Sequence, residues 1–196
     1  MQDNSNFSPQ ESIRLIESMI KEARNKYSEN GYLYLFWGWV ILLCSLGNFI
    51  LAYFQLYDKP YMIWWLTVAA GVYQAVYVAK HKMNRPAKSY TDILYGYIWL
   101  TFGILLLLAI TITAIKGNWD FLYPQLLALY GMPVFLSGLI LRFTPLKAGA
   151  VACWLLALTA GIVSIQYHLL LLVSAIIIAW LIPGYMLQAK YKNENK

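Results

Sequence analysis

The sequence has 196 residues, of which 60% are hydrophobic and only 12% charged, with a mean hydropathy of +0.53 and a formal net charge of +6. The length would suffice for one or two soluble domains, but such domains usually carry about twice that charged fraction. Five long stretches contain no Asp, Glu, Lys or Arg, at residues 31–57, 60–79, 93–115, 121–141 and 148–189. This distribution excludes soluble domains and predicts an all-α polytopic membrane protein.

Residues 1–30 form a polar segment before the first charge-free stretch, and we expect an amphipathic helix within it at residues 8–28. Ser8 and Glu11 fit a capping box, with Pro9 at the first helical position. Apolar residues then follow on one helical face, at Ile13, Ile16, Ile20, Ala23 and Tyr27. This helix could lie on the inner leaflet, pack under the transmembrane helices or bind another protein.

Each of the first four stretches fits one bilayer pass, because a spanning helix needs roughly 20 mainly apolar residues. The fifth is long enough for two passes around a turn at Gln166–His168. We therefore expect six transmembrane helices arranged as three hairpins, followed by a tail at residues 190–196. The expected spans are residues 31–56, 60–80, 91–115, 119–141, 146–165 and 168–189.

The first span opens on the aromatic-rich stretch NGYLYLFWGWVILL. Tyr32, Phe36 and Trp39 share one helical face, whereas Tyr34 and Trp37 point elsewhere. Aromatic residues distributed around the entry of a helix are typical of a membrane-interface belt. A partial role in a ligand pocket is the alternative, although a stacking box would gather the rings on one side.

The placement of Lys and Arg predicts the orientation of the chain. All of them except Lys59 and Lys116 fall in the N-terminal segment, the second and fourth connections between spans, and the tail. Because cytoplasmic loops are enriched in Lys and Arg, both termini should face the cytoplasm from the inner membrane.

The second connection carries the densest basic run, KHKMNRPAK. Its cations are Lys80, Lys82, Arg85 and Lys88, and we expect them to set the orientation of the chain in a solvated loop. Contact with anionic lipid head groups follows from the same charges. A nucleic-acid partner is not expected, because the topology already explains the excess positive charge.

Small residues recur at regular spacings in the odd-numbered spans. In the first span they fall every seven positions, at Gly31, Gly38, Ser45 and Ala52; the third has Ser89, Gly96, Gly103 and Gly117 on the same period, with Ile110 at the intervening place. The fifth span has Ala150, Cys153, Ala157, Ala160 and Ser164, at alternating spacings of three and four. Small residues let helix backbones approach closely in lipid, and a period of seven favours left-handed packing. These spans should form either the tightly packed centre or the seam of a homo-oligomer.

Four further positions inside the spans could shape the bundle or contact a ligand. Asn48 and Gln74 are buried amides that need hydrogen-bond partners, which neighbouring helices usually supply. Pro133 and Pro183 each lie beside a glycine and remove a backbone hydrogen bond, so both should kink their helices. Such breaks can mark a transport site, although proline is also common in membrane helices simply as a shaping residue.

No catalytic, cofactor or metal signature is found in the sequence. Pumps and ion-coupled transporters place ionisable side chains inside the membrane, whereas Asp58, Asp92 and Asp120 all fall at the ends of the expected spans. The isolated His81 and His168 do not form a metal-ligand set. We therefore expect neither an enzyme nor a bound cofactor.

The run ESIRLIESMIKEARNKYSENGYLYLFWGWVILL resembles the start of small bacterial membrane proteins of the Bacteroidota type, a group with no established activity. The likeness is best over residues 9–50, and it implies the same amphipathic helix followed by an aromatic first span. It transfers no functional residue.

Two functions fit these observations. One is a non-catalytic regulatory or interaction subunit that binds a protein partner through the N-terminal helix and the packed spans. The alternative is a transporter or binding protein for a small uncharged or amphipathic molecule.

Overall fold

The computed structural model describes residues 31–82 and 90–194, and every regular element in those ranges is helical. The elements are α2 (Gly31–Tyr53), η1 (Pro60–Trp64), α3 (Trp65–Lys82), α4 (Tyr90–Lys116), η2 (Trp119–Phe121), α5 (Leu122–Ile140), α6 (Thr144–Ala160), η3 (Ile165–Tyr167), α7 (His168–Ile176), η4 (Ile177–Leu181) and α8 (Ile182–Glu194). The amphipathic helix expected at residues 8–28 lies outside the described residues, as do Arg85 and Lys88.

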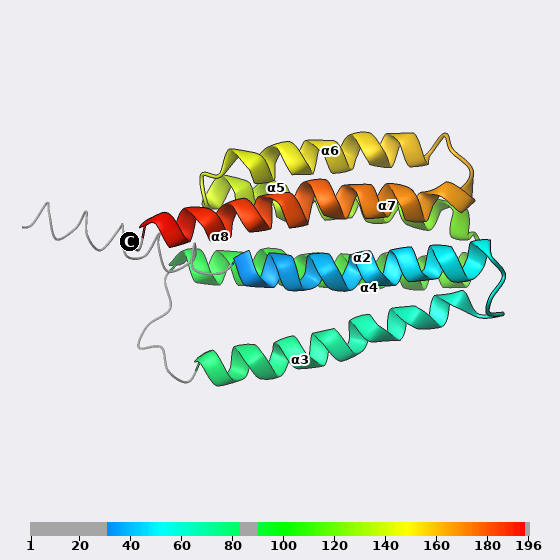
Figure 1. Cartoon of the computed structure of the whole chain (residues 1–196), viewed down its shortest axis with the longest axis horizontal. Helices are drawn as coiled ribbons and strands as arrows, with labels where there is room; N and C mark the ends of the chain where they lie inside the picture. Colours follow the sequence, from blue (N-terminus) through cyan, green and yellow to red (C-terminus); the bar gives the residue numbers. More distant parts are fainter. Residues whose placement is uncertain (1–30, 83–89, 195–196) are drawn as a thin grey trace, which may run out of the picture.

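Five helical segments are long and apolar enough to cross a bilayer, namely Gly31–Tyr53, Pro60–Lys80, Ile93–Lys116, Trp119–Ile140 and Ile165–Lys190. With the shorter α6 they form an all-helical bundle of the multi-pass membrane type. Successive helices alternate in direction, so α2 begins and α8 ends at the same end of the bundle (Figure 1).

Helix α6 is shorter than the expected span 146–165, because it ends at Ala160 after 17 residues. At 1.5 Å per residue it measures about 26 Å, less than the roughly 30 Å of a typical hydrocarbon core. The chain turns at Gly161, whose N–H donates to the carbonyls of Ala157 and Leu158, and re-enters the bundle through η3. The sequence did not predict this turn, because residues 148–189 contain no Asp, Glu, Lys or Arg that would mark it.

Helices α2 and α5 both end in a Schellman motif without glycine. Gln55 and Arg142 have positive φ angles of 50° and 49°. The next residue in each case donates its N–H to the carbonyl five residues back, from Leu56 to Leu51 and from Phe143 to Gly138. This pattern terminates a helix by satisfying its last carbonyls, and it ends α2 three residues before the expected bound of 56.

The tightest part of the bundle consists of α2, α5, α6 and the continuous α7–η4–α8 segment. Helix α5 packs most extensively against α6, and α2 packs along α7, η4 and α8. These contacts join helices that the sequence assigned to different hairpins, so they do not confirm an organisation into three hairpin units. Helix α3 lies at the outer edge, beside α2 (Figure 1).

Glycine lets two of these helix pairs approach closely. A Cβ placed on Gly31 would lie 2.5 Å from the carbonyl oxygen of Gly184, and one placed on Gly149 would lie 2.7 Å from the Cα of Ala179. Side-chain carbons do not come so close to backbone atoms, so only glycine permits these crossings of α2 with α8 and of α6 with η4.

The predicted small-residue seam is thus only partly packed within the chain. In α2, Gly31, Gly38 and Ser45 are buried, whereas Ala52 is exposed. In α4, a Cβ on Gly96 or Gly103 would meet nothing within 4 Å. The small residues of α2 are therefore mostly packed within the chain, whereas Gly96 and Gly103 of α4 are not, and the alternative of a homo-oligomer seam stays a prediction.

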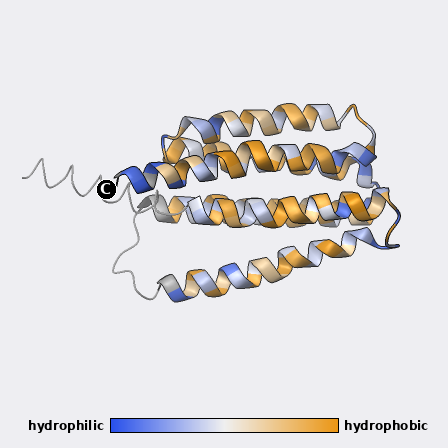
Figure 2. Cartoon of the chain, in the orientation of Figure 1, coloured by the Kyte–Doolittle hydropathy of each residue, from blue (hydrophilic) through white to orange (hydrophobic). Residues whose placement is uncertain are grey.

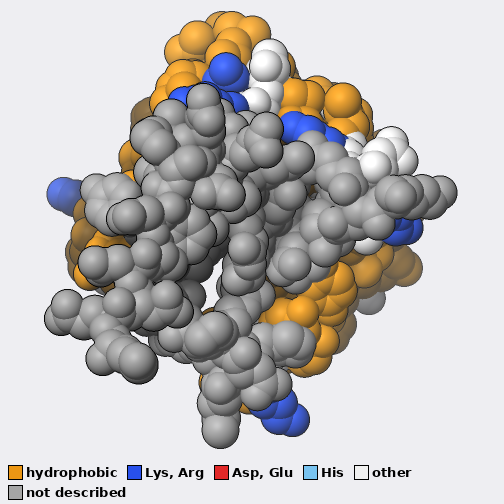
Figure 3. Space-filling view, turned by 90° about the vertical axis from the view of Figure 1, so that its left-hand side faces the viewer, with side chains coloured by type: hydrophobic (Ala, Val, Ile, Leu, Met, Phe, Trp, Pro, Cys, Tyr) orange, Lys and Arg blue, Asp and Glu red, His pale blue; other side chains and the backbone are white. Residues whose placement is uncertain are grey.

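Charge and hydropathy separate along the bundle axis. The helix ends are hydrophilic and the central stretches are mainly hydrophobic (Figure 2). We call the end where α2 begins and α8 ends the basic end, because several Lys and Arg side chains lie there (Figure 3). The described cations of this end are Lys80, Arg142, Lys147, Lys190 and Lys192.

Replacing Gly149 tests the close crossing of α6 with η4. We expect Gly149→Ala to lower the free energy of unfolding by about 1–3 kcal/mol, because the new methyl group must push η4 away. The matched control is Gly103→Ala, where the space is open and the alanine should be neutral or slightly stabilising. Unfolding of both variants in one detergent, followed by loss of helical circular dichroism, measures the difference; equal stability would contradict the packing described.

Candidate functional site

The structure places the sequence-predicted polar residues on two neighbouring helices. Asn48 is buried on α2, with 6% of its surface exposed. Gln74 on α3 accepts a hydrogen bond from the indole N–H of Trp37 on α2. Gln74 therefore acts as an interhelical tie.

The two predicted kink residues are both fully buried, but their surroundings differ. Helix α5 continues through Pro133. Pro183 follows the π-helical turn η4, in which one extra residue widens the helix. Since Pro183 has no N–H to donate to the carbonyl of Ala179, the wider turn lies where that hydrogen bond is missing.

Of the predicted lipid contacts, Lys80 is exposed at the end of α3, on the basic end. Lys82 is the last residue of α3, and nothing further is described of its side chain.

A buried group of aromatic side chains lies where α2, α4, α5 and η4 meet, and we call it the aromatic centre. Its members are Tyr34, Tyr95, Trp99, Phe102, Tyr130 and Trp180. Edge-on contacts dominate, with ring centroids 5.3 Å apart for Trp99 and Trp180 and 6.1 Å apart for Tyr34 and Trp99. Such tilted pairs contribute about 0.5–1.5 kcal/mol beyond the area that they bury.

Hydroxyl and indole groups give the aromatic centre a polar side. The Tyr95 hydroxyl donates to the Tyr34 hydroxyl at 2.5 Å. The side chains of Ser137 and Trp99 lie within hydrogen-bonding reach of the Tyr95 hydroxyl, whose oxygen can accept from them. The Trp180 indole nitrogen is buried and has no hydrogen-bond partner in the described part of the chain.

The sequence interpretation missed this centre and was wrong for Tyr34. Tyr34 is only 5% exposed and points into the core, whereas Trp39, assigned to the same belt, is 45% exposed. A signal was present in the sequence, because Trp99 and Trp180 fall in the middle of spans rather than at the interface where a belt places tryptophan. Periodicity alone could not show that the two would meet.

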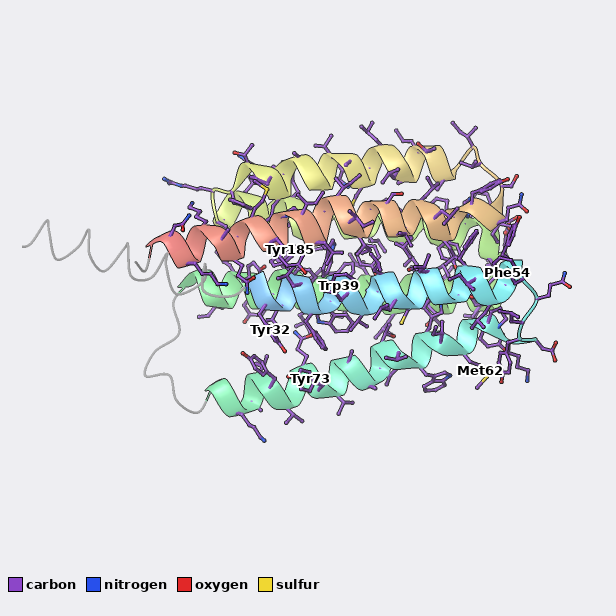
Figure 4. All side chains as sticks on the ribbon, in the orientation of Figure 1. Tyr32, Trp39, Phe54, Met62, Tyr73 and Tyr185 are labelled. Atoms are coloured by element: carbon purple, nitrogen blue, oxygen red, sulfur yellow. The ribbon has the colours of Figure 1, made fainter. Side chains whose placement is uncertain are left out.

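A second aromatic group joins α2 to α3. The Tyr32 and Tyr73 hydroxyls are 3.3 Å apart, and the rings of Phe36 and Tyr73 have centroids separated by 5.3 Å (Figure 4). On the other side of α2, the indole of Trp39 donates to the Tyr185 hydroxyl on α8 at 3.2 Å. The contact between α2 and α3 is thus made by large aromatic side chains.

The described cysteines and His168 lie on different helices. Cys44 and Cys153 are both free and buried, on α2 and α6. The His168 ring nitrogen Nε2 lies 3.0 Å from the Val163 carbonyl oxygen. Within residues 31–82 and 90–194, no three His, Cys, Asp or Glu side chains are grouped as a metal site would require.

No protein-family model, curated protein or solved structure matches this chain.

The Trp37–Gln74 hydrogen bond should couple α2 to α3. We expect the double variant Trp37→Phe/Gln74→Leu to be less destabilised than the sum of its single variants, with a coupling energy of about 0.5–2 kcal/mol. Unfolding free energies of the four proteins complete the cycle. The pair Trp39→Phe and Gln74→Leu, which share no hydrogen bond, is the control; equal coupling in both cycles would show that the bond does not tie α3 to α2.

Proposed function

We propose that this protein is a non-catalytic regulatory or interaction subunit that binds a partner membrane protein along α3 and α4. The observation that carries the proposal is the unequal burial of the helices. In the most apolar part of Trp119–Ile140 and of Ile165–Lys190, 44% and 50% of the residues are buried inside the bundle. In the corresponding parts of Pro60–Lys80 and Ile93–Lys116, only 6% and 11% are buried. Two of the spans thus contribute little to the core.

The glycines of α3 and α4 support a protein partner beside these helices. Gly71, Gly96 and Gly103 face open space. A glycine in a helix interior lowers stability relative to alanine and brings no contact with lipid. It becomes useful when the backbone of another helix approaches, which is how helices associate in membranes without a hydrophobic driving force.

A non-catalytic role is supported by the distribution of chemically reactive groups. The charged residues of the sequence lie outside its long apolar stretches. The described cysteines are buried on separate helices, and a thiol buried in apolar surroundings is unreactive.

A binding protein for an uncharged molecule is the second candidate. The aromatic centre favours it specifically, because the buried Trp180 indole nitrogen lies there beside aromatic faces and has no hydrogen-bond partner among the described residues. We further propose the cytoplasmic membrane as the location, with the basic end on the cytoplasmic side, since Lys and Arg concentrate there.

Photo-crosslinking in native membranes tests the partner surface. With p-benzoylphenylalanine in place of Val72 on α3 or Leu100 on α4, which are 62% and 59% exposed, we expect one discrete crosslinked polypeptide. The control is the same residue in place of Leu158 on α6, which is 70% exposed and should give lipid adducts only. Lipid adducts at all three positions would contradict the proposal. Repeating the experiment without residues 1–28 then tests whether the N-terminal segment contributes to binding.

Cysteine labelling tests the orientation. We expect Asn118→Cys, between α4 and η2, to react with a membrane-impermeant maleimide added outside intact cells. Asn193→Cys, near the end of α8, should react only after the membrane is opened. The native Cys44 and Cys153 are buried and provide the unlabelled background. The reverse pattern would overturn the orientation.

A further inference from the structure

Three cations from distant parts of the chain converge at the basic end. Arg142 lies in the short turn between α5 and α6, and Lys147 follows as the fourth residue of α6. The Lys190 ammonium nitrogen of α8 lies 6.0 Å from the centroid of the Phe143 ring, so α8 brings its charge to the same turn. Lys and Arg side chains are visible in the upper part of this end of the bundle (Figure 3). We call Arg142, Lys147 and Lys190 the cation cluster.

The side chain of Lys147 is held in place by packing. A Cβ on Gly138 would lie 2.9 Å from the Cγ of Lys147, so the stem of this lysine lies against the end of α5. A lysine whose stem is already packed loses less side-chain entropy when its ammonium group binds an anion. Helix α6 begins beside it without a side-chain cap, which adds a partial positive charge to that of the cations.

The cation cluster keeps an excess of positive charge over the described acids. Asp58 and Asp120 lie at the opposite end of the bundle, and Asp92 lies near the start of α4. Glu194 follows Lys190 by one turn of α8 and is the nearest described acid along the chain. One carboxylate beside three cations leaves a net positive charge, which a bound anion would offset.

An exposed apolar face continues from Lys147 along α6. Val151, Leu155 and Leu158 follow it at intervals of four, four and three residues, so all four side chains share one face of the helix. The three apolar side chains are 45%, 60% and 70% exposed. In a bilayer this face contacts acyl chains, while a lysine at the end of the helix reaches the level of the head groups. Cations above an apolar face match a molecule with an anionic head and a long apolar tail.

We propose that the cation cluster binds the phosphate of an anionic phospholipid, whose acyl chains lie along the exposed face of α6. A zwitterionic phospholipid carries the same phosphate, but its own ammonium group offsets the charge that the cluster attracts. The site is distinct from the lipid contact expected for Lys80 and the connection that follows it. It is also independent of partner binding along α3 and α4 and of the aromatic centre.

Photo-crosslinking followed by mass spectrometry of the attached lipid tests the proposal. The full-length protein carries p-benzoylphenylalanine in place of Val151, one turn after Lys147, in nanodiscs of equal parts phosphatidylglycerol and phosphatidylcholine. The matched control has the same residue in place of Val76 on α3, which is 49% exposed and lies one turn before Lys80. We expect the adducts at Val151 to be enriched about fivefold or more in phosphatidylglycerol, and those at Val76 to follow the bulk composition.

Substitutions of single cations separate the cluster from a general effect of positive charge. We expect Arg142→Gln and Lys147→Gln each to lower the ratio of phosphatidylglycerol to phosphatidylcholine at Val151 by up to about fivefold, the effect of one cation near an anionic lipid. Glutamine retains the Cγ that packs against Gly138, and Lys147→Arg, which keeps the charge, should retain the enrichment. Lys80→Gln removes the same charge from the basic end and should leave the ratio at Val151 unchanged.

Three results would overturn the proposal. The first is an adduct at Val151 that follows the bulk lipid composition. The second is an equal loss of enrichment with Lys80→Gln, which would show a general attraction of the basic end. The third is loss of enrichment in excess inorganic phosphate, which would assign the cation cluster to a soluble anion, whereas a lipid held by its acyl chains should stay bound.

Discussion

The close crossings of α8 with α2 and of η4 with α6 determine how the rest of the bundle is arranged. Lipid supplies no hydrophobic force between helices, so association depends on dispersion contacts that strengthen as backbones approach. Gly31 and Gly149 permit such an approach because a side chain at either position would collide with backbone atoms. The α7–η4–α8 segment is thereby held between α2 and α6, and α5 completes the tight group through α6.

The wide turn before Pro183 links this packing to the aromatic centre. The turn η4 contains both Ala179, which faces Gly149, and Trp180, which contacts the rings of Tyr34, Trp99 and Tyr130. Pro183, which was expected to kink its helix, thus lies just after the turn that brings Trp180 into the interior. The same turn serves a close backbone crossing on one side and a polar aromatic contact on the other.

The two proposed roles use different parts of the molecule. Helices α3 and α4 keep most of their surface outside the core, and their outward glycines suit the approach of another helix. The aromatic centre lies inside, between α4 and the tightly packed helices. Helix α4 borders both regions, with Trp99 in the aromatic centre and Leu100 exposed.

The sequence by itself determined the class of the protein, the approximate position of each span and the segregation of positive charge, because the cost of placing charge in lipid is a local property of each stretch. It also predicted a partner for Gln74, since a buried amide needs one. Only the tertiary structure decided which glycines are packed and where α6 ends. It also decided that Tyr34, Trp99 and Trp180 meet. These features depend on the relative rotation and contact of helices far apart in the chain, and the heptad spacing of Gly96 and Gly103 is the same whether or not a neighbour lies against them.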